Sequence, residues 1–414
     1  MRIDKYVLET MNKRSVLELI RTKGPIHRAE IARIVDLSVP TIMKLTDALE
    51  QNGLVKTIGK GESNAKGGKR PDLLEFVSEH RYIIGVDVGR NALKAILIDL
   101  SGKIFGKASF KTGDDCTPDR VIPRLISLID GVIQGSGISM EKIIGMGVGM
   151  PGLLDTETGR VIFSPDYHWE NVDLLDPLRK RYDMRVVIEN SNRALAMGEK
   201  WFGAGQSSDY FICINLGHGI GSAIVEGGDI YRGSCGSSGE FGHITLEKDG
   251  PICDCGNCGC LETLASGNAI ARKARELAAK DKSSLIVSLA NGNVDAIDAK
   301  IVFDAARAGD TLAKSIIEPA IEYIGIGLAS YINLLDPDLI ILGGGVANAG
   351  DILLKGLNNA IRKRQMRHAG RKVKIVVGMR ESDATAIGAA SFILKALIES
   401  GGGTVQSTGR DKYA

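Results

Sequence analysis

The feature that most constrains this 414-residue chain is a short segment crowded with metal-binding side chains. His243 is followed by the run 253–260, which holds four of the seven cysteines, Cys253, Cys255, Cys258 and Cys260. Thiolates this close together repel one another unless a cation neutralises them, and zinc does so with three or four Cys and His ligands in tetrahedral geometry. The segment therefore predicts a loop folded around one zinc ion.

Composition sets the broad class of protein. With 44% hydrophobic residues, a chain of this length can bury about two or three separate cores. No apolar run approaches the roughly 20 residues of a membrane helix, and the N-terminus lacks the apolar core of a secretion signal, so we expect no membrane contact and a cytoplasmic location. The other cysteines, Cys116, Cys213 and Cys235, are scattered, as in a reducing compartment.

The charge is unevenly distributed along the chain. Residues 1–70 hold 14 Lys and Arg against eight Asp and Glu, a formal charge of +6, and the rest of the chain carries −4. A basic head on a mildly acidic body indicates a nucleic-acid-binding module joined to another domain.

The basic head shows helical periodicity over residues 14–55 with two breaks. Gly24-Pro25 ends a first helix, because proline lacks an amide donor and clashes with the preceding turn. A second helix begins near Arg28, and Ser38 is placed to cap a third that ends near Asn52-Gly53. Two short helices across a tight turn predict a helix-turn-helix, whose second helix lies in the major groove of DNA.

A winged hairpin is expected after the third helix. Residues 54–59 alternate like a strand, and the Gly- and Lys-rich residues 60–71 predict the wing tip and a linker. An alternative is a small helical interaction domain whose charge only faces solvent. The predicted contacts with operator DNA are Ser38, Val39, Thr41, Lys44, Lys66, Lys69 and Arg70.

The body contains a repeated unit of strand, glycine turn and strand. It occurs at residues 82–103 and again at 210–225, which suggests two related α/β lobes with a cleft between them. A third glycine turn at 343–345 follows a buried strand, where a base or ribose binds in nucleotide-binding folds, although it is equally explained as a packing turn. Helices are expected near 269–279, 301–307, 312–335 and 384–397.

These motifs resemble the ROK family of repressors, open reading frames and sugar kinases, which have an actin-like, hexokinase-like fold. The pattern Gly242-His243 with Cys253-x-Cys255-Gly-x-x-Gly-Cys260-x-Glu262 fits the family signature, and the winged helix matches its repressor branch. The resemblance implies an α/β fold of the ribonuclease H-like type after the N-terminal domain. The implied parts are a winged helix-turn-helix with linker (1–80), lobe I (81–198, with helix 383–400 packing back), lobe II (199–382) and a disordered tail (401–414).

The resemblance also implies which residues hold the zinc. In the family, a His and three Cys ligate a structural zinc, and the matching positions here are His243, Cys253, Cys255 and Cys260. A site of four cysteines, with Cys258 replacing His243, remains an alternative.

A sugar site is implied by the same family positions. Carboxylates accept hydrogen bonds from neighbouring hydroxyls, and a metal-bound imidazole keeps its second nitrogen for a ligand. The alternative is that Glu240 and Glu262 are ordinary surface carboxylates. The implied sugar-binding residues are Asn190, Glu240, His243, Glu262, Gly152 and Asp166, the last replacing the family's usual Asn.

Departures from the kinase pattern decide between an enzyme and a sensor. Ser191 stands where the family's kinases carry the aspartate that acts as general base, and a serine hydroxyl is far too weakly basic for that task. Bulky Arg90 and His218 occupy the two glycine turns that hold phosphate in the kinases. We therefore expect binding without catalysis. The alternative is that Asn192 or a nearby carboxylate restores some activity.

The sequence thus predicts a sugar-responsive transcriptional repressor of carbohydrate-metabolism genes. We expect a homodimer or tetramer on palindromic operator DNA, with a monosaccharide effector such as xylose, glucose or N-acetylglucosamine, and sugar closing the lobes to release DNA. An active ATP-dependent sugar kinase with an added N-terminal module is the main alternative. A third is an adaptor that docks on a sugar-transport protein.

Overall fold

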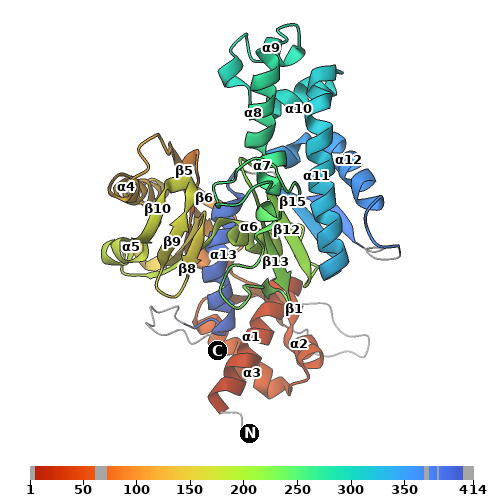
Figure 1. Ribbon diagram of the computed structural model, residues 1–414. Helices are drawn as coiled ribbons and strands as arrows, with labels where there is room; N and C mark the ends of the chain where they lie inside the picture. The colour runs from red at the N-terminus through yellow and green to blue at the C-terminus, as the bar shows by residue number, and fades with distance from the viewer. Residues whose placement is uncertain (1–4, 61–71, 368–372, 380–381, 404–414) are drawn as a thin grey trace.

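The computed structural model describes residues 5–60, 72–367, 373–379 and 382–403 (Figure 1). A helical N-terminal head sits below a body of two lobes, each built on a five-stranded sheet (Figure 1). None of the helices in these ranges is long and apolar enough to cross a membrane.

The head is a winged helix-turn-helix, as predicted. Ser38 caps the third helix, because its hydroxyl accepts a hydrogen bond from the Thr41 amide at 3.3 Å. The first helix is longer than residues 14–23, since it starts at Lys5. The elements of the head are α1 (Lys5–Lys23), β1 (Ile26–His27), α2 (Arg28–Val35), α3 (Val39–Gln51), β2 (Val55–Lys60) and β3 (Asp72–Phe76).

The expectation that residues 60–71 include a linker to the body is wrong. Strand β3 pairs antiparallel with β2, so the segment between them connects the two strands of the wing. The body follows β3 almost directly, through the short turn η1 (Ser78–His80), and the Leu100 amide donates to the Ser78 carbonyl at 3.2 Å. The predicted DNA contacts Lys66, Lys69 and Arg70 lie outside the described residues.

Lobe I contains the sheet β11-β7-β4-β5-β6 and a small sheet β10-β9-β8. Helices α4 and α5 cover its outer face (Figure 1). Its elements are β4 (Tyr82–Val88), β5 (Ala92–Asp99), β6 (Ile104–Lys111), α4 (Pro118–Ser136), η2 (Met140–Lys142), β7 (Ile143–Met150), β8 (Leu153–Asp155), β9 (Arg160–Ser164), η3 (Pro165–Tyr167), β10 (Trp169–Asp173), α5 (Leu175–Arg181) and β11 (Arg185–Asn190).

Lobe II contains the sheet β14-β13-β12-β15-β16. The helices expected in this lobe are present, and their ends lie within a few residues of the predicted positions. Its elements are β12 (Phe211–Leu216), β13 (Ile220–Glu226), β14 (Asp229–Ile230), η4 (Phe241–His243), α7 (Leu261–Ala265), α8 (Gly267–Ala278), α9 (Leu285–Leu289), η5 (Val294–Ala296), α10 (Ala299–Arg307), α11 (Thr311–Leu335), β15 (Leu339–Gly343), η6 (Val346–Ala349), α12 (Asp351–Arg362) and β16 (Lys374–Val377).

The predicted repeat is confirmed by strand pairing. Strands β4 and β5 form an antiparallel pair in lobe I, and β12 and β13 form the same pair in lobe II. In each lobe the first strand of the pair also runs parallel to a further strand, β7 or β15, so the two sheets share one topology over these strands. The fold is therefore the two-lobed α/β arrangement that the sequence predicted.

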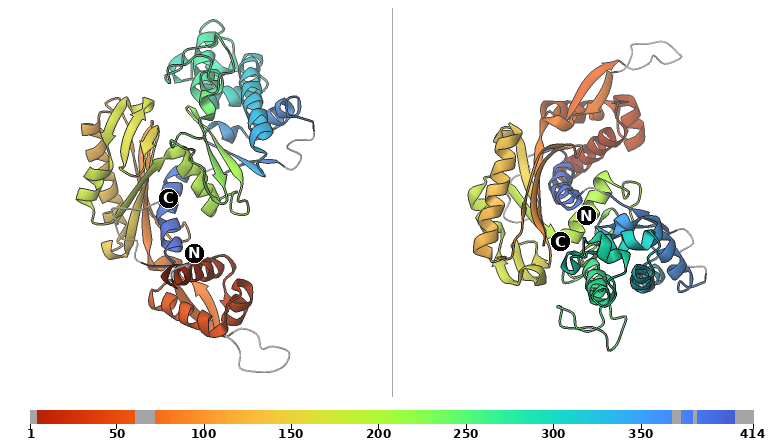
Figure 2. Two further views of the ribbon diagram at one scale, coloured as in Figure 1. Left: turned by 60° about the horizontal axis from the view of Figure 1, so that its bottom comes forward. Right: turned by 90° about the horizontal axis from the view of Figure 1, so that it is seen from above.

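Two helices, α6 (Ser191–Phe202) and α13 (Ala384–Glu399), fill the space between the two sheets. Helix α13 packs on β4 and β7 of lobe I, whereas α6 packs on β12 and β13 of lobe II (Figure 2). Their axes approach closely at Gly388, where a side chain would lie 1.8 Å from the Ala194 carbonyl oxygen. Glycine is required there because any larger residue would push the helices apart.

The head shares a buried hydrophobic cluster with the body. Leu17 and Ile20 of α1 belong to the same cluster as Ile98 of lobe I and Leu397 of α13. The expectation that residue 401 begins a tail with little to bury is wrong at its first positions. Gly402 is buried against the head, and its carbonyl accepts a bond from the Asn52 side chain at 3.3 Å. Residues 404–414 lie outside the described residues.

Candidate functional site

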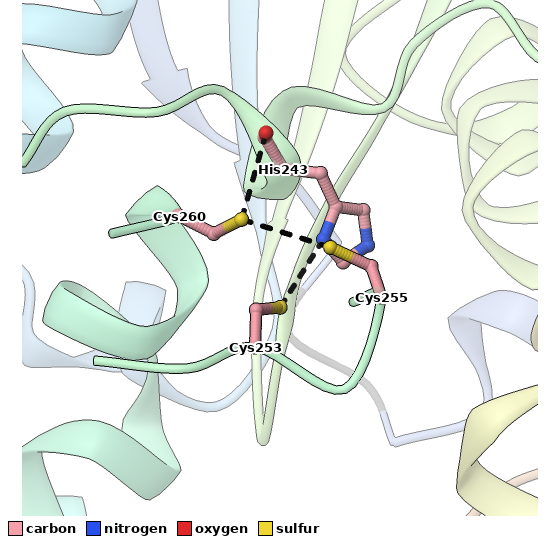
Figure 3. Close-up of side chains that lie close together, drawn as sticks. All are labelled: His243, Cys253, Cys255 and Cys260. Carbon is pink, nitrogen blue, oxygen red and sulfur yellow. Dashed lines mark hydrogen bonds between the residues drawn. The ribbon is translucent and has the colours of Figure 1, made fainter. Parts of the chain in front are cut away.

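The segment 243–260 forms a compact Cys and His cluster (Figure 3). One ligand atom each from His243, Cys253, Cys255 and Cys260 lies within 4.8 Å of all the others. The Cys253 sulfur lies 3.6 Å from His243 Nδ1, and the Cys255 and Cys260 sulfurs are 3.7 Å apart. Such a set of three sulfurs and one nitrogen has the chemistry of a structural zinc site.

Burial raises the pKa of the Cys260 thiol to about 12, and a metal bound by this sulfur would have to displace its proton. The four-cysteine alternative is not what the structure shows. Cys258 stays outside the cluster, and its thiol donates instead to the Lys248 carbonyl at 3.2 Å. The residues that fit a metal are therefore those implied by the family resemblance.

His243 faces two ways. Its Nδ1 points to the thiols, whereas its Nε2 lies 3.9 Å from a carboxylate oxygen of Glu240. A cation on Nδ1 would fix the ring and leave Nε2 to act with Glu240 on a ligand. The Glu240 side chain is about half exposed, which keeps its oxygens available to a ligand.

Glu262, by contrast, is held by a hydrogen bond within lobe II. One of its oxygens accepts a 2.7 Å bond from the amide of Ile220, the first residue of β13, directly after the turn between β12 and β13. That turn contains Gly219 because a side chain there would lie 2.3 Å from the same Glu262 oxygen. Burial raises the pKa of Glu262, and the Ile220 amide opposes this shift. Glu262 thus joins the metal loop to the glycine turn, a link that sequence reasoning missed.

Asn190 and Gly152 meet directly. The Asn190 side chain donates to the Gly152 carbonyl at 2.9 Å, and its oxygen accepts bonds from the Asn192 and Arg193 amides at the start of α6. Asn190 is therefore a helix cap as well as a predicted sugar contact. A ligand would have to share or replace these bonds.

Asp166 lies in η3 among charged groups from both lobes. Burial raises its pKa, and His218 and Arg90, the bulky residues of the two glycine turns, oppose that shift. Tyr167, next in the chain, donates to the Gly89 carbonyl at 2.8 Å, which holds η3 against the lobe I turn. Asp166 thus interacts electrostatically with Arg90 and His218, two of the departures from the kinase pattern, whereas the third, Ser191, begins α6.

A cavity of roughly 600 Å³ opens beside His218. Asn91 from lobe I and His218 from lobe II both line it, so it lies between the two glycine turns. Gly345 of the third glycine turn and Val346, the first residue of η6, also line it, where the sequence predicted a base or ribose site or a packing turn.

Arg193 is a functional candidate that sequence reasoning missed. Its guanidinium is almost fully buried, lies 3.5 Å from a Glu189 oxygen and donates to the carbonyls of Gly236 and Ser238, at 2.5 and 3.4 Å. The signal available in the sequence was an arginine four residues after Glu189, followed by the apolar run Ala194–Met197. The two carbonyls that it contacts, more than 40 residues away, carried no signal of their own.

On the head, the predicted DNA-contact residues share the start of α3. Ser38 and Val39 are exposed, and Lys44 is exposed while lying 3.4 Å from Glu9 of α1. Thr41 is half-buried and hydrogen bonds to the Ser38 hydroxyl at 2.8 Å. The exposed N-terminal end of α3 is the region that enters the major groove in helix-turn-helix proteins.

The fold and these sites define a DNA-binding head fused to a sugar-kinase-like body, and family models match both parts. The ROK family model covers residues 83–396, and a winged helix-turn-helix DNA-binding model covers residues 12–56. The chain belongs to the ROK family.

Relatives fall into two groups. A xylose repressor of Caldicellulosiruptor bescii is 31% identical over 95% of this chain and 97% of its own length. A glucokinase of Thermotoga maritima is 38% identical but covers only 75% of this chain, with 96% of its own length. Among solved structures, a ROK family transcriptional regulator, a homologue of the E. coli MLC protein, superposes with a TM-score of 0.82 at 28% identity, covering 95% of this chain and 98% of its own.

Proposed function

We propose that this protein is a transcriptional repressor that binds a monosaccharide in its cleft and thereby changes its affinity for operator DNA. The observation that carries the proposal is the buried cluster shared by the winged helix and the body. The head therefore packs on lobe I and on α13, so a movement of these elements can reach it, as a regulator requires. The match to a xylose repressor over nearly the whole chain supports the same function.

In this proposal a zinc ion is held by His243, Cys253, Cys255 and Cys260 and has a structural role. A bound zinc neutralises the thiolates and fixes the loop. The residues themselves then read the ligand: Glu240, His243 and Glu262 from lobe II, and Asn190, Asp166 and Gly152 from lobe I. Xylose, glucose and N-acetylglucosamine are the sugars to test first.

Phosphorylation of the sugar is not part of the proposed function. Ser191 is the first residue of α6, directly after Asn190, so the position of the family's general base carries a hydroxyl. Loss of a positioned base costs about 10² to 10⁴ in rate. His218 and Arg90 further change the two turns on which phosphate positioning depends.

The second candidate function is an ATP-dependent sugar kinase, favoured by the 38% identity to a glucokinase and by the cavity between the glycine turns. A coupled assay for ADP release with the three sugars separates the two. Turnover above about 1 s⁻¹, within the usual range of enzymes, would overturn the sensor proposal. We expect no sugar-dependent ADP release.

Sugar binding is tested by thermal unfolding with a panel of sugars, because a ligand that binds the folded state raises the melting temperature. We expect one sugar to raise it, and Glu240→Gln to abolish that shift. DNA binding is tested with duplexes selected by the protein from a random pool. Lys44→Ala should weaken binding and lower its salt dependence. If no duplex is enriched, docking on a sugar-transport protein becomes the better proposal.

We further propose that the protein acts as a homodimer or tetramer in the cytoplasm, with two heads in successive major grooves of a palindromic operator. Sedimentation with and without a selected duplex tests the assembly. A monomer on DNA would contradict it.

A further inference from the structure

We propose that helix α6 transmits the state of the sugar cleft to the DNA-binding head, through Arg193 at its cleft end and Trp201 at its head end. The inference rests on the proposed function and adds its route of regulation. The helix has 12 residues and is therefore about 18 Å long, which is enough to connect the two places.

At the cleft end, Arg193 ties the start of α6 to the loop that leads to Glu240. Its guanidinium donates to the carbonyls of Gly236 and Ser238, which lie just before Glu240 in lobe II. Glu189 completes the arrangement: it accepts a 2.8 Å bond from the Asn190 amide and forms an ion pair with Arg232 of the same loop. The chain at Asn190 and the loop before Glu240 are thus joined by the buried pair of Arg193 and Glu189 together with the partly exposed Arg232.

The buried guanidinium of Arg193 does not easily lose its contacts with Glu189 and the two carbonyls, because leaving a buried charge unpaired is costly in free energy. A sugar that pulls on Glu240 must therefore move the loop and Arg193 together, or break the set of bonds as a unit. Either way the movement acts on the first turn of α6. Desolvation lowers the pKa of Arg193, and the carboxylates Glu189 and Glu240 oppose this shift.

At the other end of α6, Trp201 contacts the head directly. The Arg21 guanidinium of α1 lies over the Trp201 ring, 4.7 Å from its centroid, and pairs with Glu18 at 2.6 Å. Trp201 and Phe202 also pack against the buried cluster that α1 shares with the body. A cation over an aromatic face is an attractive and directional contact, so a shift of Trp201 changes where α1 rests.

Between its ends, α6 is held as a rigid body. It packs along α13, and Gly388 leaves no room for slack at their crossing. Helix α13 also reaches the head, where Glu399 lies 3.9 Å from Arg14 of α1 (Figure 2). A movement at the cleft is therefore more easily passed along the helix pair than absorbed within it.

The test compares the DNA affinity of the full-length protein with and without sugar. The DNA is a duplex selected by the wild type from a random pool, and the sugar is whichever of D-xylose, D-glucose and N-acetyl-D-glucosamine raises its melting temperature. The measured quantity is the coupling factor, the ratio of the two dissociation constants. Trp201→Leu should reduce this factor by about fivefold or more, with the sugar affinity and the sugar-free DNA affinity within about twofold of wild type.

Two matched variants control for the loss of the ring. Trp201→Phe keeps an aromatic face for Arg21 and should retain most of the coupling. Phe105→Leu removes the ring beneath Lys103, a similar contact at 4.8 Å within lobe I, and should leave the coupling unchanged. If Trp201→Leu keeps the wild-type coupling factor, or if Phe105→Leu loses as much, the proposal is wrong.

The cleft end is tested separately. Arg193→Gln should weaken sugar binding by about tenfold or more, whereas Arg193→Lys should restore part of it because the charge is kept. A sugar affinity unchanged in Arg193→Gln would overturn the assigned role of that residue. If the wild type itself shows no response of DNA affinity to any sugar, then the proposed function fails, which is distinct from a failure at α6.

Discussion

The two glycine turns of this protein have the same backbone plan and different chemistry. In lobe I, β4 ends in Asp87-Val88-Gly89, and in lobe II, β12 ends in Asn215-Leu216-Gly217. Each turn faces the start of one central helix. Asp87 lies near Asp383, the N-cap residue of α13, whereas the Asn215 side-chain amide donates to the Asn192 side-chain oxygen in α6 at 3.0 Å.

The two turns contact their helices through different kinds of side chain. The lobe I turn is joined to its helix through charges, since Lys94 lies opposite Asp87 and also donates to the Ser382 carbonyl. The lobe II turn is joined through neutral amides, and through Glu262 it is connected to the metal loop. The contact between the lobe II turn and its helix therefore uses uncharged side chains, whereas the lobe I turn has a buried carboxyl, Asp87, at the matching place.

Among these predictions, we expect the largest effect from removing the metal site of lobe II. Cys260→Ser, or a strong chelator, should release one zinc per chain and weaken sugar binding by about tenfold or more, because the loop that places His243 and Glu240 loses its ligand set. Metal content by mass spectrometry and sugar-induced thermal shifts measure this. Cys258→Ser is the matched control and should keep both. Equal loss in that control would revive the four-cysteine alternative.

Separating the two central helices should disturb both lobes at once. Gly388→Ala places a methyl group 1.8 Å from the Ala194 carbonyl oxygen, so it should lower the free energy of unfolding by about 2 kcal/mol. Gly131→Ala in α4, where nothing lies within 4 Å, is the control and should be neutral or slightly stabilising. Urea denaturation measures both. A neutral Gly388→Ala would mean that the helix crossing is looser than described.

Placing a carboxylate in the lobe II turn, where lobe I has Asp87, tests the difference between the two turns. Asn215→Asp removes the amide that donates to Asn192 and places two oxygens together, so it should cost about 2 kcal/mol at pH 7. Protonation of the new carboxyl would restore a donor, so the loss should shrink as the pH is lowered to 5. Denaturation curves at the two pH values test this. A loss that does not change with pH would point to a steric cause.

The reverse exchange, Asp87→Asn in lobe I, should change the stability in the opposite direction and only at the higher pH values. Burial raises the pKa of Asp87 to about 6 in the folded protein, above its value of 3.8 when unfolded, with Lys94 opposing and Asp383 adding to the shift. The folded state therefore binds this proton more tightly, and the wild type loses stability as the pH rises from about 4 through 6.

The Asp87→Asn variant has no such carboxyl, and the attraction to Lys94 is already included in the raised pKa. We expect it to be equal to the wild type in stability near pH 4 and more stable by up to about 3 kcal/mol at pH 7. Unfolding free energies measured across this pH range give the difference directly. A variant that is less stable at pH 7 would show that the ion pair with Lys94 outweighs burial.

Several features were predictable because they depend on residues close together in the chain. Ser38 caps α3, because a cap contacts amides only three residues away. The ligand cluster of His243 and the three cysteines likewise lies within one loop. The repeated strand pairs were predictable from apolar runs around glycines, because hairpin geometry is local.

Sequence alone therefore determined the family, the two lobes, the winged head and the residues able to hold a metal. Only the tertiary structure decided what these residues do for one another. In the folded protein the Asn190 side-chain oxygen caps α6, and Glu262 accepts a hydrogen bond beside the turn of Gly219. The buried Arg193 donates to a carbonyl more than 40 residues away. The physical reason is that the partners of a buried polar group are set by which distant segments meet, and no local pattern records that meeting.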